Sequence, residues 1–211
     1  MNSYIRMKDD LSTATVLLNT ATELFVTHGY AGTSIRAITD RAGANLGAVT
    51  YHYGTKDALY QAVAASLLEP FREHVAATAE VPGAPLDRLE SLVRAVFQYL
   101  HAHPELPRFI VQQLAAVRPV PVAVQTALEA NHRVIAELIA AGQRDGSIRD
   151  GDARLLALSV VAQPIWMTVV REFLQQAIGV DQRDPRTRAE IIDTAMRFVR
   201  AGLAGPRGPQ P

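Results

Sequence analysis

The stretch Thr33–Asp57 constrains this chain more than any other, because its pattern predicts two short helices joined by a tight turn. Apolar residues at helical spacing indicate a first helix over Ser34–Arg41, and either Thr33 or Ser34 is placed to cap its first N–H groups. Gly43 follows in the turn, and glycine readily takes the positive φ that often ends a helix.

The second helix of the pair is expected over Leu46–Tyr51. Asn45 is placed to cap it, Gly54 to end it, and Thr55 to cap a third helix that starts at Lys56. Two short helices joined by a turn of about three residues with a glycine form a helix-turn-helix. The second helix of that motif enters the major groove of DNA. The stretch therefore predicts a DNA-binding function.

The same residues resemble a known protein family. The run A-G-A-N-L-G-A-V-T-Y-H-Y-G-T-K-D-A-L-Y, which covers Ala42–Tyr60, is similar to the DNA-binding signature of the tetracycline-repressor (TetR) family of bacterial regulators. The preceding run, Leu17–Ile35, resembles the family's first helix and the loop behind it. Thr50 stands where the family most often has Tyr, and Leu46 where many members have a polar or basic residue. The sequence is nearest to a subgroup with an A-V-N-Y-H-F-G-S-K-like recognition helix.

Apolar spacing along the chain predicts an all-α fold of about nine helices. Residues 1–10 are expected to form a loose arm. Outside the motif, the expected helices are Ser12–His28, Lys56–Ala79, Leu86–Ala102, a short one restarted by Pro104 and Pro107 and running through Val117, Val122–Arg144, Ala153–Ile178, and a last one after the Asp184-Pro185 cap. The expected parts are a DNA-binding domain over 1–56, an effector-binding and dimerisation domain over 57–205, and a disordered tail over 206–211.

Side chains in and around the motif are expected to contact DNA. They are Thr33, Ser34, Arg36, Asn45, Leu46, Ala48, Thr50, Tyr51, His52 and Lys56. Arg36 matches the family position that often reaches a guanine, and Lys56 matches a near-invariant lysine that binds phosphate. Leu46 and Ala48 are placed to touch thymine methyl groups. The alternatives are that Arg36 is a solvated helix residue and that His52 is a packed loop histidine.

The second half of the chain is expected to bind a small effector in a mostly apolar pocket with few polar anchors. The candidate lining residues are Phe97, Phe109, Gln113, His132, Gln163, Trp166, Met167 and Val170. Trp166 and Met167 follow Pro164, which removes a helix hydrogen bond and favours a distorted wall there. The alternative for each of these residues is plain core packing.

The expected partners are a double-stranded operator DNA, a second copy of the chain and a small-molecule effector. The resemblance implies a homodimer through the last two helices, about 153–178 and 185–203, and the excess apolar surface of Ala153–Ile178 supports it. No apolar run approaches the ~18 residues needed to cross a bilayer, so no membrane partner and a cytoplasmic location are expected. The expected function is a repressor that binds a palindromic operator and is released by its effector.

Charge and motifs define the alternatives. Lys+Arg and Asp+Glu number 21 each, although a DNA-binding surface is normally basic. The single Glu129-x-x-His132 spacing lacks the second copy that a di-iron site needs, and the absence of cysteine excludes thiol catalysis. No metal, cofactor or enzymatic activity is therefore expected. An effector-independent regulator or activator on the same fold stays open, as does a helical small-molecule carrier or enzyme.

Overall fold

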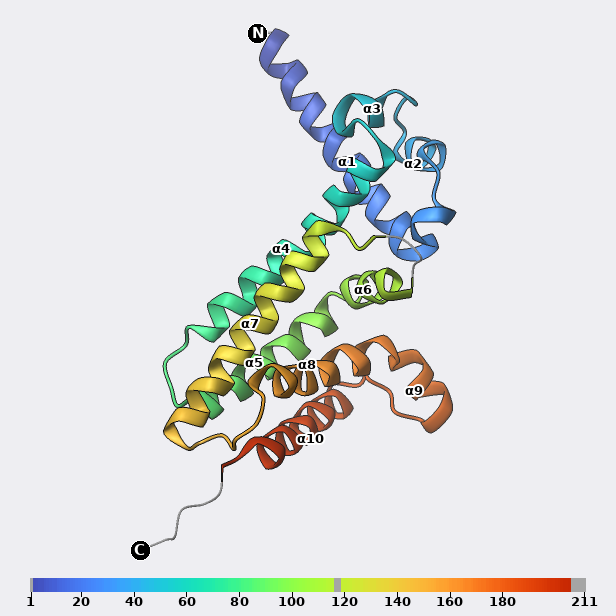
Figure 1. The fold of residues 1–211 in the computed structure, drawn as a ribbon. Coiled ribbons are helices and arrows are strands. Elements are labelled where there is room, and N and C mark those ends of the chain that lie inside the picture. Colours follow the sequence, from blue (N-terminus) through green and yellow to red (C-terminus); the bar gives the residue numbers. More distant parts are fainter. Residues whose placement is uncertain (1, 116–118, 206–211) are drawn as a thin grey trace, which may run out of the picture. The chain divides into compact units, whose positions relative to one another are not determined.

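The computed structural model describes residues 2–115 and 119–205, which form ten helices (Figure 1). They are α1 (Asn2–Gly32), α2 (Ile35–Ala42), α3 (Ala48–Tyr53), α4 (Lys56–Ala79), α5 (Pro85–Ala102), α6 (Glu105–Ala115), α7 (Val122–Asp145), α8 (Ala153–Val169), α9 (Arg171–Ile178) and α10 (Pro185–Leu203). The predicted all-α fold is confirmed. The tail over 206–211, and Val117 at the end of the predicted short helix, lie outside the described residues.

The helices pack as two compact units. The first unit comprises Met1–Glu69 and Arg108–Gln125, and the second comprises Pro70–Pro107 and Thr126–Pro211. The first part of α4 and the C-terminal part of α6 thus belong to the same unit as the helix-turn-helix. The functional division between residues 56 and 57 stays a prediction.

In the first unit, α1 packs against α2 and α3 (Figure 1). Its core includes the fully buried Leu17, Phe25, Ile38 and Val49. The chain is already helical from Asn2, so the loose arm predicted over residues 1–10 is wrong. No Gly or Pro occurs between residues 2 and 11, and the sequence there offers nothing to stop the helix.

The first helix of the motif follows its sequence signals. Ser34 caps α2, because its Oγ accepts a hydrogen bond from the Ala37 N–H at 3.0 Å. Gly43 ends α2 with φ 65°, in the left-handed region that glycine tolerates. Thr55 caps α4 in the same way, through the Ala58 N–H at 3.0 Å. These three predictions are confirmed.

The second helix of the motif begins later than predicted. α3 starts at Ala48 rather than Leu46, and it continues to Tyr53 before Gly54 ends it. The Asn45 carbonyl accepts from the Ala48 N–H at 3.0 Å in a turn, while the residue that precedes the helix is Gly47, which has no capping side chain. The predicted cap by Asn45 is therefore wrong, because a turn over residues 45–48 comes first.

In the second unit, α5 packs against both α8 and α10. Leu89, Leu92 and Leu100 of α5 are fully buried. Arg200 of α10 pairs with Glu90 and, at 2.6 Å, with Asp87 at the start of α5. Hydrogen bonds to Glu90 and then Asp87 raise the pKa of Arg200. The α5–α10 contact therefore has an apolar core and a charged edge.

The end of α10 is tied to the connection between α7 and α8. Ile148 and Ala204 form an isolated antiparallel bridge. The Arg149 N–H donates to the Leu203 carbonyl at 2.8 Å, and the Gly205 N–H donates to the Ser147 carbonyl at 3.0 Å. We call this set of backbone contacts the C-terminal clasp.

The long apolar helix predicted over Ala153–Ile178 is divided in two. α8 ends at Val169, and α9 starts at Arg171 after a bend of 68°. The Met167 carbonyl, which would accept from residue 171 in a continuous helix, instead accepts from Gln182 Nε2 at 3.0 Å. The break accounts for ten helices instead of the predicted nine.

Among the described residues, no single helix is both long and apolar enough to cross a bilayer, and α8 with α9 meets the criteria only as a bent pair.

Candidate nucleic-acid interface

The side chains of α3 divide between the core and the solvent. Val49 is fully buried against the rest of the motif, whereas Tyr51 is 74% exposed and Thr50 is also exposed. Leu46, in the turn before α3, is 60% exposed. Large apolar side chains exposed together on a small unit often mark a binding surface. This face of the motif is therefore available to a partner.

Two residues expected at the DNA are buried in the structure. Thr33 is buried, and its Oγ1 lies within hydrogen-bond distance of the carbonyls of Leu24 (3.1 Å) and Gly29 (2.9 Å). Ala48 is buried as well, because it packs at the start of α3. Burial leaves these two side chains little surface for DNA, and Thr33 instead holds the loop between α1 and α2.

The remaining polar candidates lie on the surface. Ser34, Arg36 and Asn45 are exposed, and His52 is partly exposed, with its ring edge-to-face against Tyr51 at 4.8 Å. Arg41 of the same helix is exposed as well. Arg41 pairs with Glu23 at 2.6 Å.

Lys56 is held beside the motif by an aromatic ring. Its Nζ lies 4.1 Å from the centroid of the Tyr30 ring, at cation–π distance. The neighbouring Tyr53 donates its hydroxyl to the Ala14 carbonyl of α1 at 2.8 Å, and burial raises the pKa of Tyr53. Together these contacts fix the start of α4 relative to α1.

A hollow of about 290 Å³ lies between α1 and the turn before α3. It is lined by Ser12, Thr13, Val16, Ala42, Gly43, Ala44, Asn45 and Ala48. It adjoins the exposed face through Asn45.

Sequence reasoning missed that α6 packs onto this unit. Tyr60 of α4 donates its hydroxyl to Gln113 Oε1 of α6 at 2.8 Å, and both side chains are buried. Gln112 Nε2 donates to the Val26 carbonyl of α1 at 2.7 Å. Phe109 adds a ring contact to Tyr60 at 5.5 Å. Two predicted effector residues, Phe109 and Gln113, therefore lie in the core that joins α6 to α1 and α4.

The other effector candidates lie in the second unit, on α5, α7 and α8 and, for Val170, between α8 and α9. Phe97 is buried in the core, and Gln163, Met167 and Val170 are partly exposed. Trp166 is 63% exposed, so in the single chain it faces the solvent.

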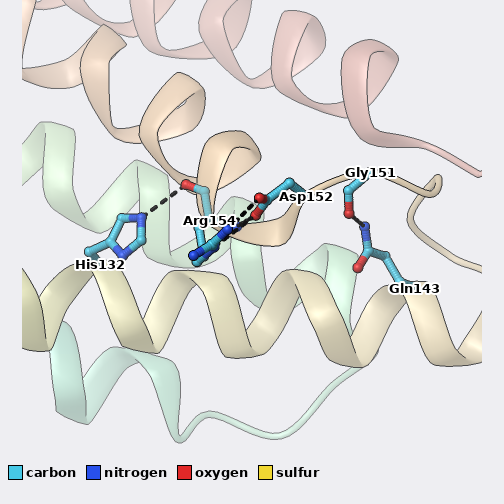
Figure 2. A network of polar contacts seen from close by, with 5 residues as sticks. All are labelled: His132, Gln143, Gly151, Asp152 and Arg154. Atoms are coloured by element: carbon cyan, nitrogen blue, oxygen red, sulfur yellow. Dashed lines mark hydrogen bonds and ion pairs between the residues drawn. The ribbon is translucent and has the colours of Figure 1, made fainter.

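His132 belongs to a network between α7 and the start of α8, shown in Figure 2. Its Nε2 lies 2.9 Å from the Arg154 carbonyl, which can only accept, so Nε2 carries the proton. Gln143 Nε2 donates to the Gly151 carbonyl at 2.9 Å. Asp152 caps α8 and binds the Arg154 side chain, and these hydrogen bonds lower the pKa of Asp152 to about 2. This network positions the beginning of α8.

The Glu129-x-x-His132 spacing does not form part of a metal cluster. In residues 2–115 and 119–205, no group of three or more His, Cys, Asp or Glu side chains is arranged to hold a metal ion.

Two family models match the chain. The model described as "Bacterial regulatory proteins, tetR family" matches residues 17–63, and "Tetracyclin repressor-like, C-terminal domain" matches residues 85–199, more than half of the sequence. The chain therefore belongs to the TetR family of bacterial regulatory proteins, and it is a helix-turn-helix transcriptional regulator.

Individual relatives agree with this assignment. An HTH-type transcriptional repressor of Mycobacterium tuberculosis is 32% identical over 164 residues, which cover 71% of this chain and 87% of the relative. The HTH-type transcriptional activator FasR of Mycolicibacterium smegmatis is 29% identical over 189 residues, covering 89% and 81%. The fold is similar to that of AibR, solved with isovaleryl coenzyme A and operator DNA, with a TM-score of 0.73, 17% identity and coverage of 89% and 97%.

Proposed function

We propose that this protein is a repressor that binds a palindromic operator as a homodimer and is released by a small effector. The observation that carries the proposal is the exposed face of the helix-turn-helix, where Leu46 and Tyr51 project while Val49 anchors α3 to the core. Two copies of α3 would enter successive major grooves, about 34 Å apart.

The proposed DNA contacts are the exposed members of the predicted set. They are Ser34, Arg36, Asn45, Leu46, Thr50, Tyr51, His52 and Lys56. Arg36 reads a guanine and Lys56 binds phosphate, while Leu46 and Thr50 lie near base edges. The run A-V-T-Y-H-Y-G-T-K (Ala48–Lys56) supports membership of the subgroup with A-V-N-Y-H-F-G-S-K.

The proposed dimer surface lies on α8 and α10. Leu155, Leu158 and Trp166 are exposed, and at 100° per residue they fall on one side of α8. Phe198 is exposed on α10. A second copy that covered these side chains would remove a large apolar surface from water. Trp166 is accordingly assigned to the dimer surface rather than to the effector.

Release is proposed to pass through α4 and α6 together. α4 runs from the first unit into the second, and the contacts of Gln112 with Val26 and of Gln113 with Tyr60 join α6 to α1 and α4. An effector that favours another position of α6 would change the contact between Gln112 and α1. Its effect is bounded by its differential affinity for the two states.

The proposed effector is an acyl thioester of coenzyme A, or the free acid of an apolar acyl chain. The support is the structural neighbour AibR, which was solved with isovaleryl coenzyme A. No catalytic role is proposed.

The test is fluorescence anisotropy of the purified protein on its own upstream intergenic DNA, across a salt series. Tight, palindrome-dependent binding with a steep salt slope is expected. If ligand-free protein bound no sequence from a genomic selection, the regulator function would be refuted.

An activator is the second candidate, because the relative FasR is named as one. A reporter under the operator distinguishes the two: deletion of this protein should raise expression for a repressor and lower it for an activator.

A further inference from the structure

A group of polar side chains in the second unit has hydrogen-bonding atoms that the fold leaves unused. Its members are His101 near the end of α5, Arg171 at the start of α9, Gln182 between α9 and α10, and Arg188 in the first turns of α10. We call these four residues the His101 cluster. Gln182 is the buried member of the cluster, and both arginines are partly exposed.

Three buried atoms of the cluster make no hydrogen bond of normal geometry with the described residues. Gln182 is only 4% exposed, and its Nε2 donates to the Met167 carbonyl, whereas its Oε1 is buried without a hydrogen bond. Both ring nitrogens of His101 are also buried, and among the described residues the ring has only a contact with the Gln182 backbone that falls short of normal hydrogen-bond geometry. Native folds leave few buried polar atoms unsatisfied, so these atoms require an explanation. Gln182 Oε1 only accepts hydrogen bonds, whereas the His101 ring carries an N–H that can donate to an anion.

Arg188 brings a positive charge to the cluster without pairing at hydrogen-bond distance with a carboxylate. Its Nε and Nη2 donate to the backbone carbonyls of Gln182 and Arg183, both at 3.3 Å. The Asp184 carboxylate accepts hydrogen bonds from Thr187, which lower its pKa. The charge of Arg188 lowers the pKa of Asp184 further, without a hydrogen bond between the two side chains. Much of the hydrogen-bonding capacity of the Arg188 guanidinium is therefore available.

Arg171 adds a second positive charge. Its Nη2 lies 3.8 Å from Glu172 Oε1, longer than a hydrogen bond. Burial lowers the pKa of His101, and the charges of Arg188 and Arg171 lower it further, against a rise caused by the Gln182 backbone carbonyl. The two neighbouring cations disfavour the charged form of His101, and a bound anion would offset their positive charge.

We propose that the His101 cluster binds the anionic group of a small-molecule ligand, a carboxylate or a phosphate. Arg171 and Arg188 supply charge-assisted hydrogen bonds, and the His101 ring supplies a further donor. The site lies at the break between α8 and α9, because Gln182 holds that break through Met167. The inference rests on the proposed effector control, since this anion would anchor the effector.

The test titrates the full chain by calorimetry with octanoate, octanamide, coenzyme A and octanoyl-coenzyme A. Octanoate and octanamide differ only at the head group, so at least roughly tenfold tighter binding of octanoate assigns a carboxylate. A similar gain for coenzyme A or its thioester over octanamide assigns a phosphate. If none of the three anionic probes binds more tightly than octanamide, the proposal is overturned.

A variant identifies the residues. Arg171→Gln should lower the affinity for the preferred anionic probe by roughly tenfold or more, because it removes charge-assisted hydrogen bonds. Arg186→Gln is the matched control, because Arg186 is an exposed arginine at the start of α10, outside the cluster. Thermal unfolding of both variants checks that they fold. Equal affinities for the two variants and the unmodified protein would overturn the assignment to this cluster.

The pKa of His101 gives a readout that would not change with the probe if the cluster were only structural. In an NMR titration, the preferred anionic probe should raise the pKa of His101, because an anion stabilises the imidazolium. A pKa that stays unchanged at saturating probe would contradict the proposal.

Operator binding, measured by anisotropy on the same samples, separates two failures. If the protein binds the operator but prefers no anionic probe, the anion site is refuted and the proposed regulator function stands. If the protein binds anions at the His101 cluster but recognises no operator, only the proposed regulator function is refuted.

Discussion

The two units of the molecule expose apolar side chains in different ways. In the first unit, Leu46 and Tyr51 lie close together in one motif whose turns are fixed by Ser34 and Gly43. In the second unit, exposed apolar residues extend along three helices, α8, α9 and α10. The proposed DNA surface is thus a short segment with defined turns, whereas the proposed subunit interface extends over α8 and α10. Substitutions in the first unit should act on one contact, and those in the second on the whole assembly.

The largest effect is expected at the proposed dimer surface. Leu158→Glu should produce a monomer at micromolar concentration and lower operator affinity by at least about 100-fold, because a charge would be buried in an apolar interface and one reading helix lost. Light scattering and anisotropy measure the two effects. Val122→Glu, at an exposed apolar residue of α7, is the control and should remain dimeric. If the Leu158→Glu variant stayed dimeric with full operator affinity, the proposed dimer surface would be wrong, and with it the contrast between the two units.

The contact between α4 and α6 should be the next most sensitive. Tyr60→Phe leaves the buried Gln113 Oε1 without its donor, which should lower the free energy of unfolding by about 1–3 kcal/mol. Chemical denaturation measures it. Tyr51→Phe alters an exposed hydroxyl and should leave stability unchanged. Equal stability of both variants would mean that the α6 contact contributes little.

A smaller and purely local effect is expected at Lys56. Lys56→Ala should weaken binding to every DNA sequence by roughly tenfold and reduce the salt slope by about one, because one phosphate contact is lost. Arg41→Ala is the control, since Arg41 is paired with Glu23. An unchanged slope in the anisotropy salt series would contradict the phosphate role of Lys56.

The smallest effect concerns acid stability at the start of α8. The pKa of Asp152 is lowered from 3.8 to about 2, chiefly by hydrogen bonds from Arg154. Its folded-state pKa lies below its unfolded value, so the stabilisation is present above pH 3.8 and is lost as pH falls toward 2. Asp152→Asn keeps a capping side chain but should flatten this part of the acid unfolding curve, followed by circular dichroism. Asp150→Asn, at an exposed neighbour, should not flatten it.

The sequence predicted those features that depend on neighbouring residues. Ser34, Gly43 and Thr55 act on N–H groups or dihedral angles within a few positions, so their patterns sufficed. Asp184 likewise caps α10 before Pro185, as predicted. The Asn45 cap failed because the sequence did not distinguish a turn over residues 45–48 from the first turn of a helix.

Features that depend on distant residues were not predicted. The break between α8 and α9 involves Gln182, which lies beyond α9, while the apolar spacing continues through the break. The packing of α6 on α1 depends on Gln112 and Val26, far apart in the sequence. The contact of His132 Nε2 with the Arg154 carbonyl of α8 joins residues far apart in the sequence and was not predicted either. The DNA and effector residues themselves stay predictions.

The C-terminal clasp turns the chain from Ser147 to Gly205 into a closed loop that contains α8, α9 and α10. A protease that nicked the exposed segment around Arg183 would cut this loop without freeing α10. The severed C-terminal fragment would remain bound through Leu203 and Gly205, and through the pairing of Arg200 with α5. Nicked protein should therefore elute at its original size and separate into two fragments only under denaturing conditions.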